Sequence, residues 1–135
     1  MTSAADVPAS PPPRRHWKRR FILLGVVALP FVALFFYTTL TLAVSYSDGQ
    51  RAGILQKLSR KGWLCKTNEG ELAMSIVPGV APTIWDFSVR DARVLPQLRD
   101  ALGKRVVLHY TEHHGVPTGC FGATQYYVDS VRVTP

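Results

Sequence analysis

The sequence predicts one N-terminal transmembrane helix followed by a small, mainly-β domain. Three observations lead to this fold class. The 24 residues of 21–44 carry no charged side chain, the segments that follow alternate apolar with polar residues between Gly and Pro, and only 94–102 has the apolar spacing of a soluble helix. The chain of 135 residues has room for one such domain.

The uncharged run is long enough to cross a bilayer. As a helix it would extend about 36 Å, against a hydrocarbon core of about 30 Å. A secretory signal peptide competes with this interpretation, because residues 43–45, Ala-Val-Ser, resemble a cleavage site. The apolar part of such a peptide is at most about 15 residues long. We therefore expect a transmembrane helix over 21–44 that acts as an uncleaved signal anchor, with a kink at Pro30.

Basic residues are concentrated on the N-terminal side of this run. Five lie in the fifteen residues before it, whereas only Arg51 and Lys57 lie in the fifteen after it. The side richer in Lys and Arg stays in the cytoplasm, so we expect a disordered basic cytoplasmic tail over 1–20 and an exported domain over 45–135. The net charge of +7 then reports mainly on topology. The residues expected at the inner membrane face are Arg14, Arg15, Trp17, Lys18, Arg19 and Arg20.

Three predicted strands come first in the exported domain. Their apolar residues recur at period two: Ala52, Ile54 and Leu58, then Leu72, Met74 and Ile76, then Trp85, Phe87 and Val89. A turn at 60–62 separates the first strand from the second, which is expected to begin at Trp63. A loop rich in Pro and Gly over 78–82 separates the second strand from the third.

A short helix is predicted after the third strand. Its apolar stripe consists of Val94, Leu95, Leu98, Ala101 and Leu102. Asp91 is available as the N-cap and Gly103 as the C′ residue. Pro96 would cost such a helix an internal hydrogen bond, so the alternative is a helix that begins at Pro96 and is only two turns long.

Two further strands are expected over 104–112 and 125–134. In the last strand the apolar phase shifts between Val128 and Val131, which predicts a bulge near Asp129. The order of three strands, one helix and two strands is that of the OB-fold, a small, partly open five-stranded barrel. An SH3-like barrel is the alternative, and the helix between strands three and four favours the OB-fold.

Several runs of the chain resemble a family of small single-pass bacterial membrane proteins of unknown function. They are YSDGQRAGILQKLSRKGWLCKTNEGEL, WDFSV, GKRVVLHY and GVPTGCFG. The resemblance implies an inner membrane of a Gram-negative bacterium and a periplasmic domain, but no activity. Some relatives are labelled 6-phosphogluconate dehydrogenase. This chain has no G-x-G-x-x-G turn between a strand and a helix, so we expect neither dehydrogenase activity nor a cofactor.

Cys65 and Cys120 are the two cysteines of the chain. In an oxidising periplasm they are expected to form a disulfide, because an OB barrel brings the loop after strand one close to the loop after strand four. A metal site built with His113 and His114 is the alternative. Adjacent histidines on an extended chain point to opposite faces and exported thiols oxidise, so no metal is expected.

The function we expect is non-enzymatic binding or scaffolding in the cell envelope, in contact with the lipid bilayer and with another envelope protein or polymer. Nucleic acid is not expected in this compartment. The candidate binding face contains Lys61, Trp63, Lys66, Glu69, Glu71, His113, His114 and Phe121. The alternative is a small cell-wall glycan hydrolase, since Glu69 and Glu71 share one face of an extended strand and such enzymes use two carboxyl groups. No catalytic residue is assigned in the preferred interpretation.

Overall fold

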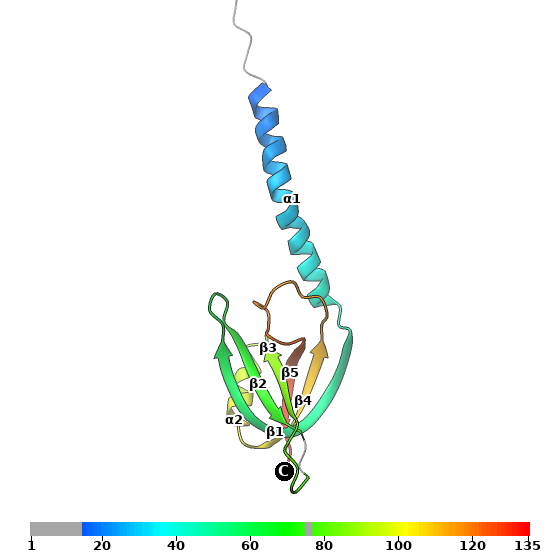
Figure 1. Ribbon diagram of the computed structural model, residues 1–135, viewed down its shortest axis with the longest axis vertical. Helices are drawn as coiled ribbons and strands as arrows, with labels where there is room; N and C mark the ends of the chain where they lie inside the picture. Colours follow the sequence, from blue (N-terminus) through cyan, green and yellow to red (C-terminus); the bar gives the residue numbers. More distant parts are fainter. Residues whose placement is uncertain (1–14, 75–76) are drawn as a thin grey trace, which may run out of the picture. The chain divides into compact units, whose positions relative to one another are not determined.

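The computed structural model describes residues 15–74 and 77–135 (Figure 1). The expected tail up to Arg14 and the expected strand residue Ile76 lie outside the described residues. The first element is the helix α1 (Arg15–Ala43), which contains Pro30 and nearly all of the uncharged run. Its segment His16–Ala43 is long and apolar enough to cross a membrane, and none of it is buried in the protein. The chain divides into two compact units at Phe36, and the second unit is Tyr37–Pro135.

Five strands form one mixed sheet that closes in a ring (Figure 1). They are β1 (Ser47–Lys61), β2 (Thr67–Ala73), β3 (Ile84–Val89), β4 (Arg105–Glu112) and β5 (Tyr126–Val133). The strand order is β1-β2-β3-β5-β4, and every pair is antiparallel except β3 with β5. The helix α2 (Leu95–Asp100) connects β3 to β4. The predicted element order, with a short helix between the third and fourth strands, is therefore confirmed.

The ring closes because β1 is long enough to pair with two neighbours. Its first half pairs with β4 and its second half with β2, and Ile54 pairs with both Ala73 and Arg105. A bulge at Gln56 follows this change of partner, since Leu55 pairs with Leu72 while Lys57 pairs with Glu71. A bulge bends a strand and increases its twist, which a small closed sheet requires.

The bulge corrects the predicted face of the first strand. We expected Ala52 and Ile54 to share an inward face with Leu58, but Ala52 is exposed and Leu55 is fully buried. Before the bulge the odd-numbered residues of β1, such as Leu55, face the core. The extra residue at Gln56 shifts the alternation by one, so that after it the even-numbered Leu58 packs against the core. The second strand also begins later than expected, at Thr67, because residues 62–66 form the turn.

The core lies inside the ring and beneath α2. Its buried members are Leu55, Leu72, Trp85, Phe87, Val89, Val94, Leu98, Ala101, Val106, Leu108 and Val128. The predicted alternation of the third strand is confirmed. The bulge at Asp129 is also confirmed, because His109 pairs with Ser130 and Tyr110 pairs with Val128.

The helix α2 is the shorter of the two predicted forms. It begins at Leu95 with Pro96 in its first turn, and its N-cap is Val94 with no side-chain cap. The expected cap, Asp91, instead accepts hydrogen bonds from the backbone and guanidinium of Arg93. Leu102, expected on the apolar stripe, remains 41% exposed because the helix has ended before it.

Candidate functional site

A disulfide joins two connections of the ring. Cys65 lies in the β1–β2 turn (62–66) and Cys120 in the β4–β5 loop (113–125), and their Cα atoms are 5.0 Å apart. The predicted pairing is thus confirmed. We call the part of the domain formed by this turn and this loop the loop end; both lie at one end of the ring in Figure 1. A disulfide is typical of proteins outside the cytoplasm, and an apolar N-terminal helix is typical of a signal anchor or signal peptide.

Two large apolar side chains project from the β1–β2 turn. Trp63 is 98% exposed and Leu64 is 87% exposed, the highest values for large apolar residues in the described part of the chain. Gly62 fixes the turn with a φ of +123°, and a Cβ there would collide with the carbonyl oxygen of Cys65. Trp63 and Leu64 therefore project from the turn without packing against the ring.

A small pocket of about 230 Å³ lies beside the disulfide. Its lining residues are Lys66, Thr67, Asn68, Val89, Arg90, Cys120 and Phe121. The guanidinium carbon of Arg90 lies 5.7 Å from the ring centre of Phe121 and 5.6 Å from that of Tyr127. Such stacking orders an arginine while its N–H groups remain free to bind. Lys66 adds a second cation to the pocket.

Glu69 is buried at the base of the loop end. It is only 5% exposed, and its carboxylate accepts hydrogen bonds from the Ser88 hydroxyl at 2.6 Å and from the Ala123 N–H at 3.0 Å. The Thr124 N–H donates to the Ser88 hydroxyl oxygen at 3.0 Å. These bonds attach the β4–β5 loop to β2 and β3, so Glu69 acts as a structural anchor of that loop.

Glu71 has a different partner. The Lys57 ammonium lies 2.7 Å from its carboxylate, and this hydrogen bond lowers the pKa of Glu71 and raises that of Lys57. Glu69 and Glu71 occupy alternate positions on β2, as expected for residues of one face. Their partners differ: the Glu69 carboxylate binds residues of β3 and of the β4–β5 loop, whereas the Glu71 carboxylate binds Lys57 of β1.

The two histidines of the candidate face do not meet the cysteines. His113 is buried, and its Nδ1 lies 3.1 Å from the carbonyl oxygen of Thr41 and 3.2 Å from that of Val44. It therefore caps the last carbonyls of α1. His114 is exposed, 2.8 Å from Glu112 and edge-on to the ring of Tyr46. Over the described residues, no group of three His, Cys, Asp or Glu side chains is arranged to hold a metal.

The residues expected at the membrane face lie at the start of α1. Arg15 begins the helix, and the side chains of Trp17, Lys18, Arg19 and Arg20 are exposed. The Trp17 ring stacks on Phe21 at 5.4 Å between ring centres. Lys61, which belongs to the candidate binding face, is the last residue of β1 and is exposed.

A family model for a domain of unknown function, DUF8785, matches residues 44–132. The chain belongs to the DUF8785 family. The matched region extends from the end of α1 into β5 and includes both cysteines. No curated protein and no solved structure gave a significant match to the chain.

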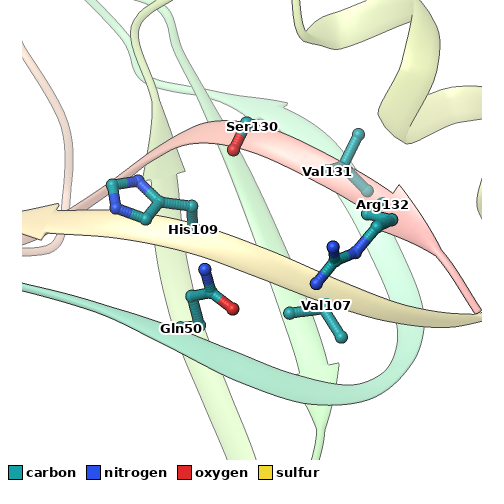
Figure 2. A pocket seen from close by; sticks show the side chains of 6 residues that line it. All are labelled: Gln50, Val107, His109, Ser130, Val131 and Arg132. Carbon is teal, nitrogen blue, oxygen red and sulfur yellow. The ribbon is translucent and has the colours of Figure 1, made fainter.

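The DUF8785 domain has a second surface pocket that sequence reasoning did not find. Figure 2 shows this pocket of about 260 Å³, with side chains of β1, β4 and β5 around it: Gln50, Val107, His109, Ser130, Val131 and Arg132. The Nδ1 of His109 is 2.7 Å from a carboxylate oxygen of Asp129. His109 faces outward on β4, opposite the bulge of β5 that contains Asp129.

Aromatic side chains also form a cluster inside the ring. The Trp85 ring lies within 5.5 Å of those of Tyr110 and Tyr126, and the guanidinium of Arg51 stacks over Trp85 at 4.8 Å. Arg51 precedes the bulge of β1 and has the same alternation as Leu55, so it faces the inside of the ring. The cluster fills the ring from within, so it supports the fold rather than forming an open site.

Proposed function

We propose that this protein is a membrane-anchored module of the bacterial cell envelope that binds another envelope protein or polymer through its loop end, without catalysis. In this proposal α1 is an uncleaved single-pass anchor in the inner membrane, the N-terminus is cytoplasmic and the DUF8785 domain is periplasmic. The apolar helix and the disulfide support the export of the domain. The excess of basic residues before the helix supports its orientation.

We further propose that the closed ring is an OB-type barrel rather than an SH3-like one. The support is the strand order β1-β2-β3-β5-β4, the parallel contact of β3 with β5 and the position of α2. OB-folds bind ligands with the face of strands two and three and with the loops that follow strands one and four. In this chain those two loops form the loop end.

The observation that carries the binding proposal is the disulfide between the two loops. By fixing them to each other it reduces the conformational entropy that a partner would otherwise have to remove on binding. Beside it, Lys66 and Arg90 line a pocket with the ring of Phe121. Two cations and an aromatic face suit an acidic group, such as a carboxylate or phosphate of a protein or envelope polymer.

Site-specific crosslinking in cells tests this proposal. A photoreactive amino acid would replace Lys66 or Phe121 at the loop end, and Gln97, which is exposed on α2, as the control. We expect both loop-end positions to capture the same partner and the control position to capture none. Capture at Gln97 alone, or equal capture at all three positions, would contradict a partner at the loop end.

The glycan hydrolase remains a prediction to be tested with the same cells. Glu69→Gln together with Glu71→Gln should abolish the function of a hydrolase, whereas a binding module should keep its crosslinked partner. Glu71→Gln alone is an informative second variant, since Glu71 is on the surface and its loss should not disturb folding. Loss of glycan cleavage in this single variant would favour the enzyme.

A further inference from the structure

We propose that Trp63 and Leu64 insert into the surface of the bilayer that α1 crosses, so that the DUF8785 domain has a second, non-covalent attachment to the membrane. This inference rests on the proposed membrane anchorage and goes beyond it, because it names the surface that the tip of the β1–β2 turn contacts. The occupant is a phospholipid surface with anionic headgroups.

The exposure of the tip is the first observation. Trp63 and Leu64 are adjacent, 98% and 87% exposed, and held away from the ring by the conformation of Gly62. Neither side chain belongs to the core, so folding does not account for two large apolar residues at this position. An apolar projection with no role in packing is typical of an interaction site.

The position of the tip is the second observation. The Cys65–Cys120 disulfide joins the turn to the β4–β5 loop, and that loop begins at His113, which binds the carbonyl oxygens of Thr41 and Val44. These carbonyls lie at the end of α1, where the chain leaves the apolar helix. The tip therefore lies at the end of the domain that is connected to the exit of the helix. If α1 spans the bilayer, the chain leaves the lipid at this end of the domain.

The composition of the tip is the third observation. Three exposed cations flank the two apolar residues, Arg60 and Lys61 before them and Lys66 after them. Tryptophan is enriched at the boundary between lipid and water, and basic side chains are attracted to anionic headgroups. An apolar tip flanked by cations therefore fits the boundary between an anionic bilayer and water. The opposite end of β2 carries Val80 in an exposed loop, which provides a matched control.

Quenching of tryptophan fluorescence by lipids tests the inference on the full-length protein in vesicles of phosphatidylethanolamine and phosphatidylglycerol. Trp17→Phe removes the tryptophan of the N-terminal helix, and Trp85 is only 6% exposed inside the ring, so lipid quenchers act on Trp63. Insertion of about 5–10 Å is expected for a residue at the interface. A quencher attached near the headgroup should remove the larger part of the emission of Trp63, and a quencher at the end of the acyl chain should remove much less.

Two control variants complete the design. Trp17→Phe with Trp63→Phe should leave an emission that lipids do not quench. Adding Val80→Trp to that variant should give an exposed tryptophan that also resists quenching, since it lies at the other end of the ring. Equal quenching of Trp63 and of the tryptophan at this control position would contradict a specific role of the tip.

The outcomes separate the inference from the proposed function. If the protein floats with the vesicles and Trp63 is quenched, the membrane anchor of the proposed function and the inserted tip both stand. If it floats and Trp63 is not quenched, the inserted tip is refuted and the anchor is retained. If it does not float, both are refuted. A photoreactive amino acid at Trp63 that captures a protein in cells instead of lipid would also refute the bilayer as the occupant.

Discussion

Loss of the disulfide should remove a large part of the stability of the domain. Cys65 and Cys120 are 55 residues apart in the chain. In the chain-entropy model, a loop of this size contributes about 4 kcal/mol to the free energy of unfolding by restricting the unfolded chain. Domains of this size are stable by only about 5–15 kcal/mol. Reduction should therefore lower the melting temperature by about 16–32 °C, since 1 kcal/mol corresponds to about 4–8 °C.

Thermal unfolding of the full-length protein in detergent micelles measures this effect. Near-ultraviolet circular dichroism follows the packing of the aromatic rings, including the cluster inside the ring, and avoids the far-ultraviolet helical signal of α1. The double variant Cys65→Ser with Cys120→Ser should melt at the temperature of the reduced protein and should not respond to a reductant. A shift below about 5 °C on reduction would refute the reasoning, because it would mean that the two loops stay together without the bond.

Three further predictions concern single residues. Gly70→Ala should lower the free energy of unfolding by about 1–3 kcal/mol in chemical denaturation, because its Cβ would collide with the buried ring of Phe87. Asp91 should titrate with a pKa of about 2 in carboxyl-carbon NMR, below its ordinary 3.8, because Arg93 donates hydrogen bonds to it. The contribution of this ion pair to stability is complete above about pH 4 and is lost as the pH falls towards 2. His113→Ala should destabilise the unit Tyr37–Pro135 by about 1 kcal/mol, because the carbonyl oxygens at the end of α1 lose their hydrogen-bond donor. Amide hydrogen exchange of the residues that follow position 113 should become faster.

Each of these predictions has a matched control. Gly119→Ala adds a Cβ where no atom lies within 4 Å, so it should be neutral in the experiment that tests Gly70. Arg93→Ala should return the pKa of Asp91 towards its ordinary value. His114→Ala removes an exposed histidine that binds Glu112 rather than α1, and it should leave stability nearly unchanged. A large loss of stability in Gly119→Ala or His114→Ala, or an Asp91 pKa that stays near 2 in Arg93→Ala, would show that the proposed cause is wrong.

The order of the elements could be predicted because local patterns encode it. Alternation at Trp85, Phe87 and Val89 reflects a strand with one face inside the ring, and all three are buried. The shift of apolar phase that predicted a bulge at Asp129 is also a local signal. The cysteine pair followed from compartment and topology together, which is why it could be assigned before any coordinates were known.

The remaining features depend on contacts between distant parts of the chain. The bulge at Gln56 leaves no mark in the alternation of β1, so the inward position of Leu55 was missed. Glu69 looks like a surface residue in sequence, and only the folded loop brings the Ala123 N–H to it. Likewise, nothing near His113 in the chain indicates that it binds the end of α1, 72 residues before it.

The topology of the chain tests the central claim most directly. Fusions of alkaline phosphatase and of green fluorescent protein to the C-terminus report the compartment of the domain, because the enzyme is active only outside the cytoplasm and the fluorescent protein only inside it. With the basic residues held at the cytoplasmic face, we expect an active phosphatase and a dark fluorescent protein. A fluorescent fusion with an inactive phosphatase would place the DUF8785 domain in the cytoplasm and would contradict both the anchor orientation and the periplasmic partner.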